Sequence, residues 1–317
     1  MNSFAKQLIR NLKQKRKTSA DESPRLFALL PNGLTLLDIG AAGGIEPRWE
    51  KVRESLSYIG VEPDKRSNQE LNHISRSQRT YILDSFAWNE EAEIEFNLCR
   101  KPPVSSVYIP NRKLLDHYPD AKRFDIVKKE VLKAEPLSKK LNPHKIDFAK
   151  LDIQGGELNA LKGLGDRLDD CLGVEIEVEF SELYKFQPLF GEVNNFLLSK
   201  GFYFSDFVNL CRWERDAHTG YGRCVFGDGL WMRELDNLTL KTDEEHLKYA
   251  AICSLYGKLD EAFASVYLVR DKDRDWDEFE SILLKQIKLQ KKEKNKFKIL
   301  QRIWSLYSPS SRIHLIE

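Results

Sequence analysis

Residues 34–44, LTLLDIGAAGG, join an apolar run to a turn that is built almost without side chains. The run from Leu34 to Ile39 has the composition of a buried strand, and the turn from Gly40 to Gly44 contains three glycines and two alanines. A glycine turn between a first strand and a helix lets a cofactor lie against bare backbone, with helix N–H groups facing it. The segment therefore predicts a cofactor site in an α/β fold.

Strand-like runs alternate with helix-like segments over much of the chain. The runs are LTLLDIG, SYIGVEPD, TYILDSFAW, IDFAKLDIQ and CLGVEIEVEF. This alternation indicates βαβ units and a mostly parallel sheet with helices on both faces. Two later runs, GFYFSDFVN and YGRCVFGDGLWMR, predict an antiparallel closing pair. Residues 92–98 alternate apolar and polar side chains, so we expect a half-exposed strand there, followed by an excursion over the sheet edge.

The composition divides the chain into three predicted regions. Residues 1–30 are predicted to form an N-terminal amphipathic helix and a hinge, and residues 31–236 the cofactor-binding domain. Residues 237–317 are predicted to be a helical region, because they carry no strand signal from 242 onward and are rich in Lys, Glu and Leu. We expect this region to cap the domain or to mediate self-association into a homo-oligomer, and cofactor binding to be independent of it.

Composition and charge exclude several classes of protein. With 41% hydrophobic and 31% charged residues the chain is an ordinary globular protein. Its five cysteines are odd in number and include no CxxC pair, so neither a disulfide framework nor a zinc site is predicted. No apolar run reaches the roughly 18 residues of a membrane helix, and no signal peptide is evident, which predicts a cytoplasmic protein without a transmembrane segment.

Acidic residues follow the predicted strands that surround the glycine turn. Asp38 lies two residues before Gly40, where it suits a cofactor with an amino-acid ammonium group. Glu62, 22 residues beyond Gly40, is placed to take both hydroxyls of a ribose, and Asp84 to reach an adenine amino group. The second glycine of G-x-G-x-x-G is absent, which weakens a dinucleotide interpretation. The predicted cofactor-binding residues are Asp38, Gly40, Ala41, Gly44, Glu62, Pro63, Asp84 and Ser85.

A second cluster is expected in KIDFAKLDIQGGELNALKGL. Asp152 follows a buried-looking strand, and Glu157 falls in the first turn of the next helix. With Lys150 and Gln154, these side chains should gather at the carboxyl edge of the sheet, where open α/β proteins bind ligands. Glu157 alone is equally well explained as a favourable charge at a helix start.

These motifs resemble the FkbM family of S-adenosylmethionine-dependent methyltransferases. The resemblance covers residues 34–234 and rests on DIGAAGG, VEPD, the serines at 105 and 106, KLDIQGGELNALKGL, VEIEVEFSELYKFQPLFGEVNNFLLSKGF and GDGLWMR. It implies a class I methyltransferase (Rossmann-like) fold, S-adenosyl-L-methionine as cofactor, and O-methylation of a hydroxyl of a sugar, polysaccharide or related natural product. The family commonly has D-[IV]-G-A-N-x-G, so Ala42 stands where an asparagine is expected.

Methyl transfer to oxygen mainly requires positioning of donor and acceptor, together with a group that accepts one proton. Asp152 is the first candidate for that group. Glu177 and Glu179 on the following strand are predicted partners of the acceptor hydroxyl, and Glu157 and the loop histidines His144 and His117 are further candidates. No spacing demands a metal ion.

Two other classes of function remain open from the sequence. A nicotinamide-dependent oxidoreductase would need the dinucleotide fingerprint that this loop lacks. A non-catalytic descendant would keep the fold and bind partners through its helical tail. Nucleic acid is not an expected partner, because the predicted catalytic region is acidic and has no aromatic-proline tetrapeptide suited to a flipped base.

Overall fold

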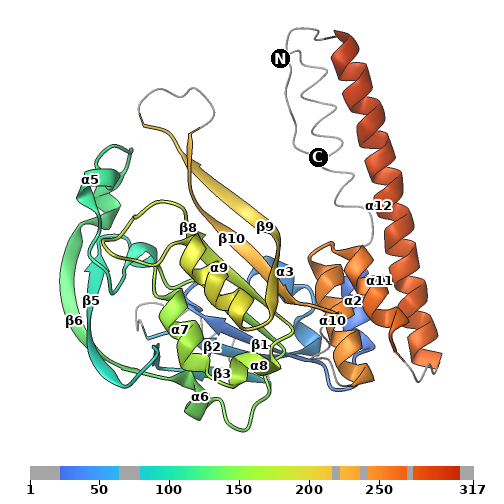
Figure 1. Ribbon diagram of the computed structural model, residues 1–317, viewed down its shortest axis with the longest axis horizontal. Coiled ribbons are helices and arrows are strands. Elements are labelled where there is room, and N and C mark those ends of the chain that lie inside the picture. Colours follow the sequence, from blue (N-terminus) through green and yellow to red (C-terminus); the bar gives the residue numbers. More distant parts are fainter. Residues whose placement is uncertain (1–21, 64–78, 216–221, 236–241, 270–273, 308–317) are drawn as a thin grey trace.

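The computed structural model describes residues 22–63, 79–215, 222–235, 242–269 and 274–307 (Figure 1). The amphipathic helix predicted near the start of the chain lies outside the described residues. Residues 22–30 of the predicted hinge are described, and they include the helix α2 (Ser23–Ala28). Leu26 and Phe27 of α2 are completely buried, so this part of the segment belongs to the folded core.

Seven strands form the large sheet, in the order β3-β2-β1-β7-β8-β10-β9. Neighbouring strands from β3 to β8 are parallel, whereas β10 is antiparallel to both β8 and β9. The predicted mostly parallel sheet with an antiparallel closing pair is therefore confirmed. The strands are β1 (Leu34–Ile39), β2 (Leu56–Val61), β3 (Thr80–Leu83), β7 (Phe148–Leu151), β8 (Gly173–Glu179), β9 (Phe202–Trp213) and β10 (Arg223–Arg233).

A small three-stranded sheet, ordered β4-β6-β5, lies beside the large one at the left of Figure 1. Its strands are β4 (Phe86–Ala87), β5 (Ala92–Cys99) and β6 (Ile126–Glu135). β5 contains the half-exposed strand expected at residues 92–98. Between β5 and β6 the chain makes its excursion, which contains η2 (Pro102–Val104), α5 (Arg112–Leu115) and η3 (Ala121–Phe124).

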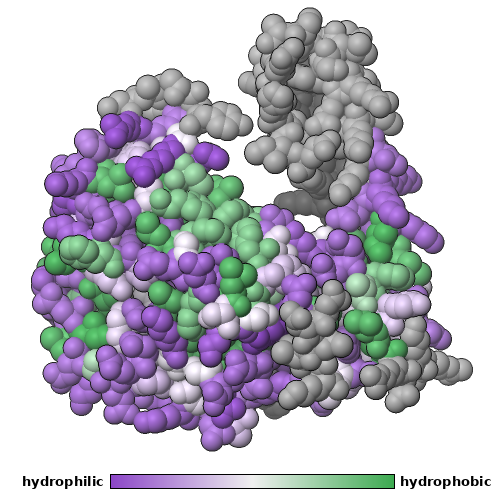
Figure 2. Space-filling model, in the orientation of Figure 1, coloured by the Kyte–Doolittle hydropathy of each residue, from purple (hydrophilic) through white to green (hydrophobic). Residues whose placement is uncertain are grey.

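One face of the large sheet is covered by α7 (Glu157–Leu164), α8 (Arg167–Asp170) and α9 (Phe190–Ser199). Because side chains alternate along a strand, every second residue of β1, β7 and β8 points to this face. Apart from Thr35 at the start of β1, those residues are apolar, and Ile39, Leu151 and Ile176 lie in one buried cluster with Leu161 of α7 and Leu197 of α9. Outside this layer, Figure 2 shows apolar surface over α9 and the β9–β10 pair.

The opposite face, which we call the tail-side face, is covered by helices from both ends of the described chain. They are α2, α3 (Pro47–Glu50), α10 (Asp243–Leu255), α11 (Leu259–Tyr267) and the first part of α12 (Arg274–Tyr307). Leu36 and Phe148 of the sheet share one buried cluster with Tyr249 of α10 and Phe279 of α12. The C-terminal helices therefore complete the core on this face of the large sheet.

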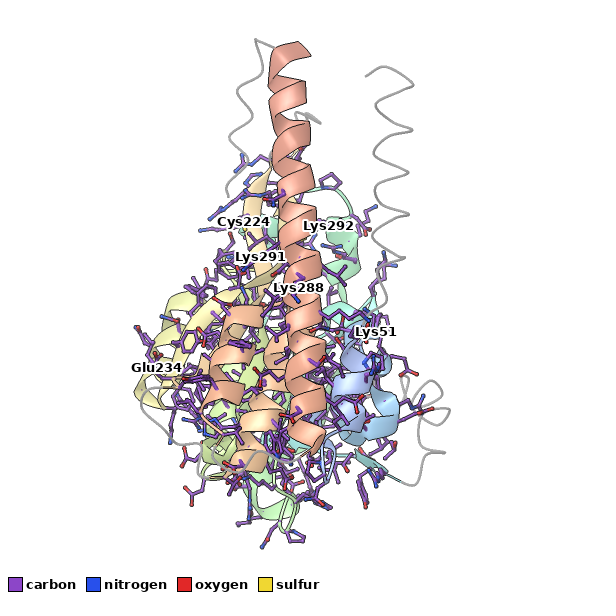
Figure 3. All side chains as sticks on the ribbon, turned by 90° about the vertical axis from the view of Figure 1, so that its right-hand side faces the viewer. Lys51, Cys224, Glu234, Lys288, Lys291 and Lys292 are labelled. Carbon is purple, nitrogen blue, oxygen red and sulfur yellow. The ribbon has the colours of Figure 1, made fainter. Side chains whose placement is uncertain are left out.

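The first turns of α12 are packed against the protein, whereas its later turns project from it. Its first turns pack on α11 and α2, where Lys285 forms an ion pair with Glu22. Further along, the helix extends beyond the body of the protein and carries Lys288, Lys291 and Lys292 on its surface (Figures 1 and 3). The remaining short elements are η1 (Arg53–Ser55) and α6 (Leu137–Lys140).

Candidate active site

The glycine turn ties the ends of three strands together at the carboxyl edge of the large sheet. Gly40 has φ +90° and donates its N–H to Val61 at the end of β2, 2.9 Å away. A Cβ atom on Gly40 would lie 2.0 Å from the carbonyl oxygen of Asp152, which follows β7. Only glycine fits there, for lack of space and because of the positive φ.

The helix after this turn is shorter than the sequence suggests. α3 begins at Pro47 and has four residues, so a long helix with N–H groups facing a ligand does not follow the turn directly. Gly44 also has a positive φ, +76°, and its N–H closes the turn onto the Ala41 carbonyl at 2.9 Å. A ligand bound here would therefore contact the backbone of the turn and not the N-terminus of a long helix.

Asp38 supplies a buried carboxylate oxygen beside the turn. Its side chain is 3% exposed, and one oxygen accepts a hydrogen bond from the Tyr58 hydroxyl at 2.8 Å. The other oxygen, Oδ1, is buried without a hydrogen-bond partner. Burial raises the pKa of Asp38, while the positive charge of Lys150 opposes that shift. A buried acceptor without a partner is costly, and a ligand ammonium or N–H group would satisfy it.

The other predicted cofactor residues differ in exposure. Glu62 directly follows β2, is 6% exposed, and is held through its N–H to Leu83 at the end of β3. Asp84 is exposed. Ser85 is buried and donates to Glu135 of β6 at 2.9 Å, so its hydroxyl joins the two sheets. Pro63 is half-buried and ends the described segment.

Three charged residues form a row across the tail-side face. Asp38, Lys150 and Glu175 are in register on the neighbouring strands β1, β7 and β8. Although burial opposes the charged form of Lys150, Asp38 and Asp152 raise its pKa. Lys150 therefore stays charged and partly neutralises the acids on both sides.

Asp152 and Glu177 are joined by Gln154. The Gln154 amide donates to Asp152 Oδ1 at 3.1 Å and to Glu177 Oε1 at 2.7 Å, and its own oxygen accepts from the Tyr184 hydroxyl at 3.1 Å. Gln154 has φ +57°, a conformation rare for residues with a side chain, and Ser106 holds its carbonyl at 2.7 Å. The sequence pattern predicted that Gln154 lies in this group but indicated no role for it.

The carboxyl groups around Gln154 repel one another. We call Asp152, Glu157, Glu177, Glu179 and Asp228 the acidic cluster. Burial raises the pKa of Glu157 to about 7, although its carboxylate accepts the Ile153 N–H at 2.7 Å. Burial and the Asp152 charge raise the pKa of Glu177 well above its usual range. Burial and Glu157 do the same for Glu179, although a hydrogen bond with the Gln187 side chain opposes this shift.

Sequence reasoning missed Asp228 and Glu175. Asp228 lies opposite Glu177 in the antiparallel β8–β10 pair, and burial and the Asp152 charge raise its pKa. Glu175 binds Arg48 of α3 at 3.0 Å, and the Tyr256 hydroxyl, just after α10, donates to the same oxygen. The alternation of β8 was visible in VEIEVEF, but it did not reveal which helix would cover each acid.

The structure does not bring the predicted histidines to the acidic cluster. His144 precedes β7, whereas Asp152 follows it, so His144 belongs to the amino edge of the sheet. Its ring contacts Tyr81, with 5.1 Å between centroids. His117 is exposed after α5. The interpretation of His144 as a catalytic candidate is therefore corrected: a residue just before a strand of the parallel sheet lies at the edge opposite the one that Asp152 reaches.

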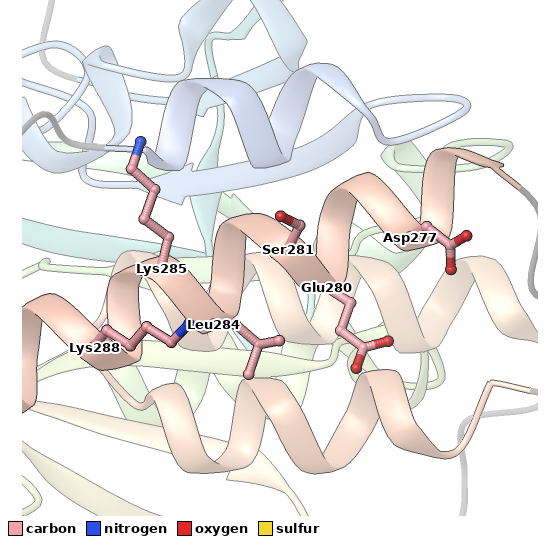
Figure 4. Close-up of a pocket in the computed structure, with 6 residues that line it drawn as sticks. All are labelled: Asp277, Glu280, Ser281, Leu284, Lys285 and Lys288. Carbon is pink, nitrogen blue, oxygen red and sulfur yellow. The ribbon is translucent and has the colours of Figure 1, made fainter.

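The described ranges offer neither a metal site nor a membrane-spanning helix. No group of three or more His, Cys, Asp or Glu side chains there could hold a metal ion, and no helix there is long and apolar enough to cross a bilayer. A hollow on α12 is lined by that helix alone, from Asp277 to Lys288, and includes none of the strand-end residues (Figure 4). The carboxyl edge of the sheet remains the candidate active site.

Comparison with solved structures gives only distant likenesses. Solved structures with a similar fold include a putative RNA methyltransferase from Pyrococcus horikoshii (13% identity, 67% of this chain and 81% of that chain, TM-score 0.32). Another is magnesium protoporphyrin IX methyltransferase from Synechocystis with bound SAM (12% identity, 74% and 86%, TM-score 0.34). These likenesses are low, and the strand order establishes the fold independently of them. No curated protein matches the chain.

The family model described as the methyltransferase FkbM domain matches residues 38–204. The matched segment runs from the acid before the glycine turn through β7, β8 and α9 to the start of β9. It covers more than half of the 317 residues. The protein therefore belongs to the FkbM methyltransferase family and has the class I methyltransferase fold.

Proposed function

We propose that the protein is an S-adenosylmethionine-dependent methyltransferase that methylates a hydroxyl group of a sugar, polysaccharide or related natural product. The observation that carries the proposal is the contact between Gly40 and the carbonyl of Asp152. Because of this contact, the turn that would bind the cofactor lies directly against Asp152, which would bind the acceptor hydroxyl.

The residues near the turn fit S-adenosylmethionine. Asp38 Oδ1 is a buried acceptor without a partner, which suits the ammonium of the methionine part. Glu62 is the carboxylate that would take the ribose hydroxyls. Asp84 is exposed and would contribute less. When bound, the cofactor supplies an electrophilic methyl group on a sulfonium.

Asp152 is the group that would take the proton of the acceptor hydroxyl. It is half-exposed, whereas Glu157 and Glu179 are almost fully buried, so an acceptor can reach it. Gln154 donates to one of its oxygens at 3.1 Å, and Lys150 lies 4.0 Å from the other. A base fixed in this way can orient the hydroxyl and receive its proton as the new carbon–oxygen bond forms.

The charge of the site supports a hydroxyl-rich acceptor. Asp152, the half-exposed member of the acidic cluster, offers a hydrogen-bond acceptor to a hydroxyl group, while its negative charge would repel a phosphate-rich polymer. Nucleic acid is therefore a poor substrate for this surface.

The test is methyl transfer to a panel of saccharides, followed by mass spectrometry, with wild type and Asp152→Asn. The Asn variant keeps the shape and removes the charge, so turnover should fall by about 10²- to 10⁴-fold. Its affinity for S-adenosylhomocysteine should stay within about twofold, since Asp152 is not placed on the cofactor. Asp169→Asn on α8, an exposed position on the other face, is the matched control. Transfer to amines but to no hydroxyl would contradict the proposal.

A further inference from the structure

Phe186 combines a strained backbone with an exposed aromatic ring. In the described part of the chain, the non-glycine residues with positive φ are Asp120, Gln154 and Phe186. Aspartate tolerates this conformation, whereas a bulky aromatic residue at φ +63° is a true outlier. The Phe186 side chain is also 88% exposed, so packing of the ring does not explain the strain. Backbone strain without a packing reason is characteristic of functional sites.

The backbone around Phe186 is held from both sides. Its own N–H donates to Glu182 Oε1 at 2.7 Å, and the N–H of Lys185 donates to the Ile109 carbonyl at 2.8 Å. The side chain of Gln187 turns back and accepts the N–H of Tyr184 at 2.6 Å. The exposed ring is therefore presented by a fixed loop.

This loop lies directly against the candidate active site. Tyr184, on one side of Phe186, is completely buried and donates to Gln154. Gln187, on the other side, has its Cβ 3.3 Å from the position that a Cβ on Gly155 would take. Phe186 is thus flanked by two residues that contact the Gln154–Gly155 segment, and it faces outward from them.

One buried polar atom of the same loop region has no hydrogen-bond partner among the described residues. It is Ser181 Oγ, on a side chain that is 2% exposed. The neighbouring Gln187 side chain is hydrogen-bonded to the buried Glu179. Buried polar groups without partners are rare in native proteins and call for a ligand or a water molecule.

We propose that Phe186 is the stacking platform for a sugar ring of the acceptor, outside the ring that is methylated. The proposal rests on the proposed function and narrows its substrate to an oligosaccharide or longer glycan. A pyranose presents C–H groups on its flat faces and hydroxyls at its rim. Its face can therefore pack on the Phe186 ring.

The first experiment compares acceptors of different length. Pentasaccharides of glucose, galactose and mannose, and the corresponding methyl glycosides, serve as acceptors for wild type and Phe186→Ala. The KM for the pentasaccharide that is methylated should rise about three- to tenfold in the variant, the size of one aromatic contact. kcat and the KM for the methyl glycoside should stay within about twofold. Phe186→Trp should keep the wild-type KM, and Tyr267→Ala, an exposed aromatic on α11, is the matched control.

A second variant distinguishes a structural role of Phe186 from a role in sugar binding. Phe186→Gly removes both the ring and the strain, so its melting temperature should be at least that of wild type. Its KM for the pentasaccharide should match that of Phe186→Ala. An unchanged KM in both variants would overturn the proposal, and so would an equal loss with the methyl glycoside.

Binding without turnover distinguishes this proposal from the proposed function. Saturation-transfer NMR measures contact between each pentasaccharide and the protein in the absence of cofactor. Binding that weakens in Phe186→Ala supports the platform even if no saccharide is methylated, in which case only the proposed function fails. If none of the pentasaccharides binds wild type, the platform is wrong.

Discussion

The hydroxyl of Tyr256 donates a hydrogen bond to the carboxylate of Glu175. Tyr256 follows α10 in the C-terminal helical region, whereas Glu175 lies in the centre of β8. The same tyrosine accepts the indole N–H of Trp49 at 3.2 Å, and Arg48 lies over its ring at 4.4 Å. The tail is therefore bonded to the sheet and to the helix that follows the glycine turn.

Tyr256→Phe tests the contribution of this hydrogen bond. The ring would still pack on Phe148 and under Arg48, but Glu175 would lose one of its two partners while remaining buried. Unfolding free energy, measured by urea titration, should fall by about 1–3 kcal/mol. Tyr267→Phe, whose side chain is exposed, should change it by less than about 0.5 kcal/mol. Equal stability of the two variants would contradict this account.

Removing the C-terminal helices should prevent folding. A chain that ends at residue 241 lacks the fully buried Tyr249, Ile252 and Phe279, and it exposes Leu36 and Phe148 of the sheet. The structure thus leads to the opposite of the expectation that cofactor binding is independent of this region. Circular dichroism and limited proteolysis would show the loss. A chain that ends at Lys292 keeps these residues and should fold; a folded, cofactor-binding 1–241 fragment would show that the shared core is dispensable.

Gly40→Ala should be severely destabilising. The new Cβ would meet the Asp152 carbonyl, and the residue would have to keep φ +90°. We expect a loss of about 3 kcal/mol or more. Gly43→Ala is a matched control in the same turn, because a Cβ at Gly43 meets nothing within 4 Å. Thermal unfolding of both variants measures the difference, and a stable Gly40→Ala protein would refute the close approach of turn and β7.

Glu62→Ala should weaken S-adenosylhomocysteine binding by about 1–3 kcal/mol, the usual effect of deleting a charged hydrogen-bond partner. Asp84→Ala should have a smaller effect, since Asp84 is exposed while Glu62 is 6% exposed. Isothermal titration calorimetry gives both values. If Asp84 proved the more important residue, the ribose would have to be assigned to the end of β3.

Glu157 should make stability depend on pH. Burial raises its folded-state pKa from 4.5 to about 7, so between these values the folded protein holds a proton that the unfolded chain releases. Stability therefore falls as pH rises through this window, by up to about 3 kcal/mol. Glu157→Gln removes the titrating group and keeps an oxygen for the Ile153 N–H. Urea titrations from pH 4.5 to 7.5 should give a flatter profile for the variant; identical profiles would exclude Glu157 as the source.

Short sequence patterns were enough to predict the strand ends and the glycine turn of the candidate site. The glycine turn and Asp152 were found because a strand end and a turn are each encoded within a few residues. The pairing of Asp228 with Glu177 was not, because it depends on the register of two strands about 50 residues apart.

The long-range contacts of the C-terminal helices could not be predicted from the sequence either. Tyr256 and Glu175 are separated by 81 residues, and the fully buried residues of α10 lie on all sides of that helix, so its pattern gives no single apolar face to assign to a partner. His144 is a different case. Its position just before a parallel strand already indicates the amino edge of the sheet, and its choice as a loop histidine did not take the direction of the strand into account.

The row of Asp38, Lys150 and Glu175 requires that β1, β7 and β8 keep their register, so none of these strands can gain or lose a residue. Inserting one residue into β7 before Ala149 would exchange the two faces of the strand. The lysine would then enter the apolar layer beneath α7 and α9, and Ala149 would stand between two acids. β9 and β10 already pair with three register shifts. Insertions and deletions should therefore be tolerated in that outer pair and excluded from β1, β7 and β8.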